Sequence, residues 1–163
     1  MTADQAKAVA EAMGQQIQSE WMTTVKVLEA VPEGKKDWKP EEKSRSAWEL
    51  ATHIAESDVW FLDGVINQQF GEPSPSGATS IAQLVGWYKA QMPNRLERVL
   101  AMDGAKLAAI VDFYGMKMPN AQYLVWQAVH NAHHRGQLSS YLRPMGGKVP
   151  SIYGGSADEP WQG

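Results

Sequence analysis

Apolar residues recur at helical spacing in four long stretches of the chain. In the first stretch they stand four or seven residues apart, at Val9, Met13, Ile17, Trp21 and Leu28. Thr2 and Gln5 match a capping box at its start, and the turn-forming segment Pro32–Gly34 ends it. Because this spacing places the apolar side chains on one helix face, the pattern predicts a helix over about residues 3–31.

A second stretch opens with Ser46 and Glu49, another capping box, and predicts a helix over about residues 47–67. Its apolar face consists of Leu50, Ile54, Phe61 and Val65. The segment that follows, residues 67–79, is rich in Gly, Pro and Ser. When extended it can reach about 40 Å, whereas a helix of about 22 residues is roughly 33 Å long. This connection can therefore cross the length of a helix bundle.

The third stretch begins with Ser80 and Gln83 and predicts a helix over about residues 81–101. Pro93 lies inside this pattern, and because proline removes one backbone hydrogen bond we expect it to kink or divide the helix. Residues 102–118 combine turn signals with a short apolar run. They predict a short helix followed by an irregular or extended connection.

The fourth stretch predicts a helix over about residues 121–143, with Asn120 as its N-cap. The segment Pro144–Gly147 ends this helix, and residues 148–163 read as a loop tail. Four long helices with one long connection indicate an all-α fold, a four-helix bundle with a crossover between the second and third helices. Residues 1–163 are predicted to form a single domain.

Composition narrows the possible functions. The chain has 163 residues, 44% of them hydrophobic and 20% charged, with a formal charge of -3. No segment is basic enough to follow a phosphate backbone, so nucleic-acid binding is not expected. The chain contains no cysteine, no apolar run long enough to span a membrane and no secretory signal at its N-terminus. We therefore expect a cytoplasmic protein whose metal ligands, if any, are His or carboxylate.

The histidines are the clearest candidates for chemistry. His130 and His134 are four residues apart on the fourth predicted helix, so their imidazoles lie on one face and can bind one ion. The same face carries Tyr123, Trp126, Gln137 and Tyr141, which suggests a pocket wall. His53 lies at the edge of the apolar face of the second helix, where it can meet a residue of another helix. Three imidazoles with one open position would suit a catalytic metal, although buried histidines are also common in cores.

Three more residues are candidates for catalytic roles. Glu56 and Gln137 could orient ligating histidines through hydrogen bonds, and His133 could act as an acid or base. Each also has a simpler structural interpretation. Glu56 can be a surface charge, Gln137 a hydrogen-bond partner within its helix, and His133 an exposed side chain. The residue after His130 is Asn131, whereas a zincin requires Glu there, and the helices lack the paired Glu-x-x-His of di-iron bundles.

Two motifs resemble those of the DinB/YfiT family of proposed metalloenzymes. They are Trp48-Glu49-Leu50-Ala51-Thr52-His53-Ile54-Ala55 and His130-Asn131-Ala132-His133-His134-Arg135-Gly136-Gln137-Leu138. The resemblance implies a four-helix bundle with a crossover, usually dimeric, in which His53, His130 and His134 bind one divalent metal ion, with Zn, Ni or Fe as candidates. It also implies, by analogy with some relatives, a small-molecule substrate and a low-molecular-weight thiol.

Three hypotheses of function remain open on the sequence. The first is a metal-dependent enzyme, either a thiol-dependent S-transferase or a hydrolase. The second is a non-enzymatic or stress-related protein in which the metal has a structural or sensing role. The third is a metal-free interaction module whose histidines pack in the core. For a dimer, Trp48 and Trp60 are candidate interface residues, because both lie off the centre of the apolar face of the second helix.

Overall fold

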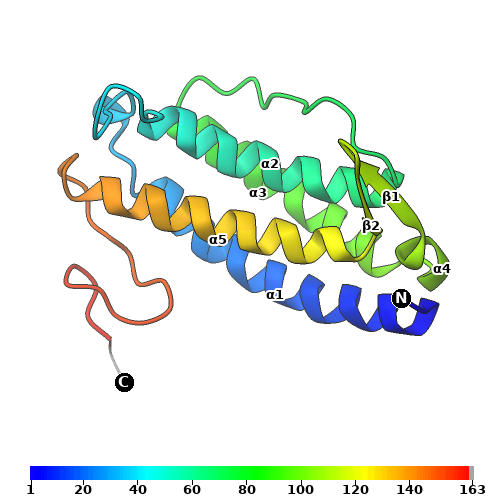
Figure 1. Ribbon diagram of the computed structural model, residues 1–163. Coiled ribbons are helices and arrows are strands. Elements are labelled where there is room, and N and C mark those ends of the chain that lie inside the picture. The colour runs from blue at the N-terminus through cyan, green and yellow to red at the C-terminus, as the bar shows by residue number, and fades with distance from the viewer. Residues whose placement is uncertain (162–163) are drawn as a thin grey trace.

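A computed structural model describes residues 1–161, and these form a bundle of long helices with a small hairpin at one end (Figure 1). The long helices are α1 (Ala3–Glu29), α2 (Ala47–Asn67), α3 (Ile81–Leu100) and α5 (Gln122–Leu142). The short elements are the 3₁₀ turn Glu33–Lys35, α4 (Gly104–Ala108), β1 (Ile110–Phe113) and β2 (Met116–Pro119). The all-α bundle expected from the sequence is confirmed. None of the helices described is long and apolar enough to cross a membrane.

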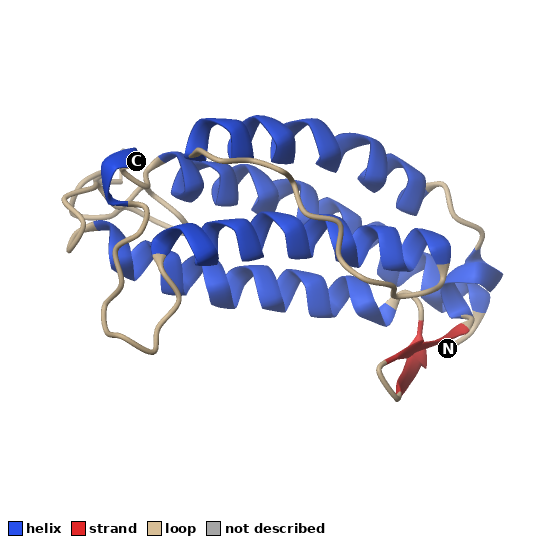
Figure 2. Ribbon diagram, turned by 90° about the horizontal axis from the view of Figure 1, so that it is seen from above, coloured by secondary structure: helices blue, strands red, loops and turns tan. Residues whose placement is uncertain are grey.

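The four long helices pack in two parallel pairs. α1 and α5 run in one direction, and α2 and α3 run in the other (Figure 1). Each pair contacts the other, because α2 packs on α5 as well as on α3, and α1 packs on α3 as well as on α5. The crossover between α2 and α3 runs along the outside of the bundle, as expected (Figure 2). Trp60 helps to hold it there by donating from Nε1 to the Gly71 carbonyl at 2.7 Å.

Three of the long helices begin with the capping residues that the sequence predicted. Both halves of the capping box form at Thr2 and at Ser46. At Ser80 only one half forms, since the Gln83 side chain accepts from Thr79 instead. The expected cap at Asn120 is wrong: its Nδ2 donates to the Val65 carbonyl at 2.8 Å, in the core. The start of α5 has no side-chain cap hydrogen bond.

Of the two outcomes expected at Pro93, a kink or a division of the third helix, the structure excludes the division. α3 continues through Pro93 to Leu100. Pro93 lies on the exposed side of α3, as does Lys89, whose carbonyl loses its helical partner. Water can therefore satisfy that carbonyl, while the opposite, buried face of α3 stays packed against α1 and α2.

Residues 102–118 contain more order than the sequence suggested. After α4, β1 and β2 form an antiparallel hairpin in which Ile110 pairs with Pro119 and Phe113 with Met116. Its two-residue turn consists of Tyr114 and Gly115, with φ of 50° and 91°. Such left-handed turns match the twist of paired strands. Of the predicted loop tail, residues 148–161 contain no helix or strand, and residues 162–163 lie outside the described part.

A buried carboxylate lies in the middle of the bundle. Asp58 of α2 is fully buried and accepts three hydrogen bonds, from the Tyr88 hydroxyl at 2.5 Å, Gln127 Nε2 at 2.7 Å and Asn131 Nδ2 at 2.6 Å. These bonds satisfy the carboxylate and join α2, α3 and α5. Burial nevertheless raises the pKa of Asp58 from 3.8 to about 6, against the lowering effect of the hydrogen bonds.

This raised pKa predicts an unusual pH dependence of stability. Because folded Asp58 binds its proton more tightly than unfolded Asp58, protonation favours the folded state. The contribution of Asp58 therefore becomes less favourable as the pH rises from about 4 to 6, by up to about 3 kcal/mol. We expect the unfolding free energy of wild type to fall by this amount relative to Asp58→Asn between pH 4 and 7. Urea unfolding of both proteins measures it, and a pH-independent difference would contradict it.

Candidate metal centre

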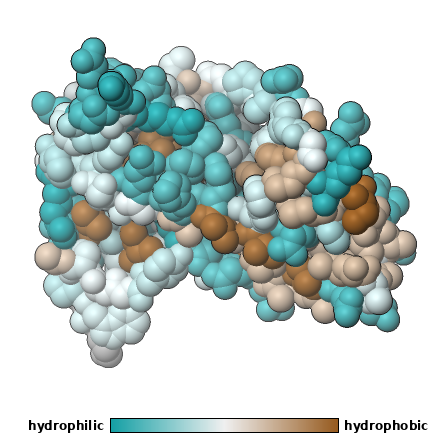
Figure 3. Space-filling view, in the orientation of Figure 1, coloured by the Kyte–Doolittle hydropathy of each residue, from teal (hydrophilic) through white to brown (hydrophobic). Residues whose placement is uncertain are grey.

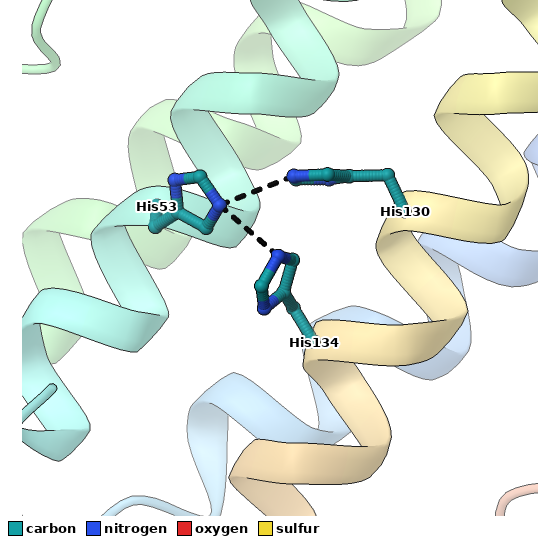
Figure 4. A group of neighbouring side chains, drawn as sticks. All are labelled: His53, His130 and His134. Carbon is teal, nitrogen blue, oxygen red and sulfur yellow. Dashed lines mark hydrogen bonds between the residues drawn. The ribbon is translucent and has the colours of Figure 1, made fainter. Parts of the chain in front are cut away.

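Three histidines meet at the seam between α2 and α5 (Figure 4). His53 lies on α2, and His130 and His134 lie one turn apart on α5. His53 Nε2 is 3.1 Å from His130 Nε2 and 3.2 Å from His134 Nε2. One ligand atom from each residue lies within 4.8 Å of the other two. All three side chains are partly exposed, so the cluster is accessible from solvent.

The outer nitrogens of two of these rings have hydrogen-bond partners. His134 Nδ1 is 3.1 Å from Gln137 Oε1, and His53 Nδ1 is 3.3 Å from the Ser57 hydroxyl. Since a carbonyl oxygen only accepts, His134 Nδ1 carries the proton, and the lone pair of its Nε2 points into the cluster. The Ser57 hydroxyl can accept from His53 Nδ1 in the same way. Partners of this kind set the tautomer that metal binding requires.

The environment keeps the imidazoles neutral. Burial lowers the pKa of His53 to about 3, with the positive charge of Arg45 as the next cause. Burial and the neighbouring His134 lower the pKa of His130 to about 4. Burial also lowers the pKa of His134, although its contact with Gln137 raises it. Neutral imidazole is the form that binds a metal ion.

These residues fit a divalent ion. Ligand nitrogens 2.0–2.1 Å from a tetrahedral ion are about 3.3 Å apart, close to the two Nε2 separations found. Without an ion the three Nε2 atoms are poorly matched as hydrogen-bond partners. His53 Nε2 has a single lone pair, and it faces the Nε2 atoms of both His130 and His134. Among residues 1–161 no carboxylate is within hydrogen-bonding distance of the three rings. The donor set is thus three neutral nitrogens, which suits Zn, Ni, Cu or Fe(II).

The three catalytic candidates from sequence take different places. Gln137 contacts His134, as described. His133 is exposed, and its ring centroid is 4.7 Å from that of His134. Glu56 does not orient a histidine: its Oε1 accepts from the backbone N–H and the hydroxyl of Ser76, both at 2.8 Å. It points to the crossover segment, although it lies only three residues after His53 on α2.

Two of the three expected pocket residues lie in the core instead. Tyr123 is fully buried, and its hydroxyl donates to backbone carbonyls of the hairpin. Tyr141 is 5% exposed and packs edge-on against Trp38. Both share the helix face of the histidines, but near the ends of α5 that face is covered by other segments. Trp126 is 40% exposed and lies beside His130 in a surface recess.

Sequence reasoning missed Ser57, the hydrogen-bond partner of His53. The signal was available, because a residue four positions after a helical histidine lies on the same face and can reach its ring. It also missed the role of Arg135, which lies next to His134. That side chain is 1% exposed and pairs with Glu20 Oε2 at 2.5 Å.

Fold and site together define a four-helix bundle with a histidine triad at a helix seam. The DinB family profile matches residues 4–162, so the chain belongs to the DinB family. It is 43% identical to the uncharacterized protein YrdA of Bacillus subtilis over 51 residues, which cover 31% of this chain and 30% of YrdA. The match therefore spans less than a third of that relative.

Two solved structures of DinB-like proteins are similar over most of the chain. One, from Bacillus cereus, is 26% identical with a TM-score of 0.76, and the match covers 88% of this chain and 97% of the Bacillus cereus chain. The other is YjoA of Bacillus subtilis, which is 25% identical with a TM-score of 0.68. The match covers 83% of this chain and 92% of the YjoA chain. They support the fold and the family, whereas metal binding and a homodimer stay predictions.

Proposed function

We propose that this protein is a metal-dependent enzyme that transfers a low-molecular-weight thiol to a small electrophilic molecule. The observation that carries the proposal is the histidine triad, in which three neutral nitrogens converge in a partly exposed cluster. His53, His130 and His134 would hold the ion. When bound, a divalent ion with an open position supplies Lewis acidity that lowers the pKa of an incoming water or thiol.

A thiol fits the surroundings of the triad better than water does. Metallohydrolases of the zincin type use a carboxylate beside the metal as general base, and the carboxylate that the sequence suggested for a role at the site, Glu56, accepts hydrogen bonds from Ser76 instead. A thiol has an ordinary pKa near 8.5 and needs far less help to ionise than water. Because the chain itself has no cysteine, the thiol must come from solution.

The protein's own residues would then have two roles besides holding the ion. Gln137 and Ser57 hold the rings of His134 and His53 in the ligating tautomer. His133, exposed beside His134, would take the proton that the thiol releases. In the transfer a sulfur–carbon bond forms on the electrophile as the bond to its leaving group breaks, and the leaving group departs with the electron pair.

The test is a metal-dependent thiol-transfer assay. Protein loaded with Zn, Ni or Fe(II) is mixed with 1-chloro-2,4-dinitrobenzene and with glutathione, bacillithiol or mycothiol, and the thioether is followed by absorbance. We expect at least one thiol to give a rate that needs metal and that falls more than about 100-fold in His134→Ala with the fold retained. Equal rates in wild type and His134→Ala, or no metal-dependent rate with any thiol, would contradict the proposal.

A further inference from the structure

An apolar recess lies on α5 directly beside the histidine triad. It has a volume of about 410 Å³ and is lined by Gln122, Val125, Trp126, Val129, His130 and His133. These residues are three or four positions apart and form one stripe along the helix. His130 belongs to both the recess and the triad, so the two are separated by a single imidazole ring.

The recess is unusual for an exposed helix face. Trp126 is 40% exposed and Val129 65%, and α5 contains no charged residue before Arg135, which is buried. Figure 3 shows hydrophobic residues gathered over the half of α5 nearest the hairpin. A helix whose outer face were only solvated would carry charges there. The hairpin extends the apolar surface, because Phe113 contacts the Trp126 ring at 6.2 Å between centroids.

We propose that this recess binds the apolar, alkyl or aryl group of the substrate whose reacting atom lies at the triad. The inference rests on the proposed function and adds the class of substrate to it. Size supports a small molecule, since ligand pockets typically enclose about 300–1,000 Å³. Continuity with the triad through His130 supports it as well. A flat tryptophan face suits an apolar group, and the uncharged walls disfavour an ionic one.

The experiment measures binding of n-alkanethiols, from ethanethiol to pentanethiol, to the Co(II)-loaded protein. The near-ultraviolet sulfur-to-cobalt absorption reports binding independently of activity. Each methylene that enters an apolar site should lower Kd about fourfold. We expect this gradient in wild type and a gradient below about twofold per methylene in Trp126→Ala, with the Kd of ethanethiol little changed.

Two further variants complete the design. Val129→Asp places a charge in the recess at a 65% exposed position, where folding should be unaffected, and should weaken pentanethiol more than ethanethiol. Trp161→Ala removes a 71% exposed tryptophan outside the recess and should leave the gradient unchanged.

The outcomes separate this inference from the proposed function. Thiol absorption without any chain-length gradient, or a gradient unchanged in Trp126→Ala and Val129→Asp, would overturn the recess as a substrate site while the metal centre stands. If Kd does not depend on chain length, and sedimentation shows that wild type is a dimer that Trp126→Ala dissociates, the recess would be assigned to the contact with a second copy of the chain. Failure to bind Co(II) would overturn the proposed function and this inference together.

Discussion

His53→Ala is expected to lose its divalent ion at metal concentrations that saturate wild type. His130 and His134 come from one helix, and of the three histidines in the described part of the chain only His53 would connect the ion to α2. Removing a residue that merely orients a ligand typically weakens metal binding 10- to 100-fold, so removing a ligand should weaken it at least about 100-fold. Elemental analysis of protein purified without a histidine tag measures the effect.

A matched control is available on the same cluster of rings. His133→Ala removes an exposed histidine whose ring contacts His134 but is not part of the triad, and it should keep its metal. Metal should also raise the unfolding free energy of wild type, by about 2.7 kcal/mol at a hundredfold excess over Kd, and not that of His53→Ala. Wild type without metal after incubation with Zn, Ni and Fe(II), or full occupancy in His53→Ala, would contradict the assignment.

Glu20→Ala is expected to destabilise the metal-free protein by about 3–5 kcal/mol, because it leaves the buried Arg135 guanidinium without its counter-charge. Arg135 is 1% exposed, pairs with Glu20 Oε2 at 2.5 Å and donates from its other terminal nitrogen to the Glu20 carbonyl at 3.1 Å. The Tyr153 hydroxyl also donates to Glu20 Oε2 at 2.9 Å, so the loss would loosen the tail as well. Urea unfolding measures the change.

The same helix supplies the control for this prediction. Glu29 of α1 pairs with Lys89 at 2.6 Å, but both side chains are nearly half exposed. Glu29→Ala should therefore cost less than about 1 kcal/mol. The double variant Glu20→Leu/Arg135→Met, which replaces the ion pair with apolar side chains, should recover most of the lost stability. Equal costs for Glu20→Ala and Glu29→Ala would show that burial does not strengthen the pair.

Arg135 illustrates how far a motif can be interpreted without coordinates. It lies between His134 and Gly136 in the most family-specific part of the sequence, where a role at the site would be a natural guess. The helical period instead turns it about 100° away from His134, toward α1. Whether an opposite charge lies there to pair with Arg135 depends on which helix packs against α5. That is a property of the tertiary structure.

The sequence by itself determined the elements that local forces control. Capping residues such as Ser46 and the helical repeat of apolar side chains predict the long helices, because both act within a few residues. The length of the segment 67–79 was enough to predict a crossover. The i, i+4 spacing was enough to place His130 and His134 together. All of these follow from backbone geometry and from interactions between residues close together in the chain.

Only the tertiary structure decided which side chains meet across helices. It brought His53 to the α5 pair, turned Glu56 to Ser76 and buried Tyr123 under the hairpin. It also kept α3 continuous through Pro93 by leaving that side of the helix to solvent. Such outcomes depend on the packing and relative rotation of neighbouring helices, which many distant contacts set together and which no local pattern in the chain encodes.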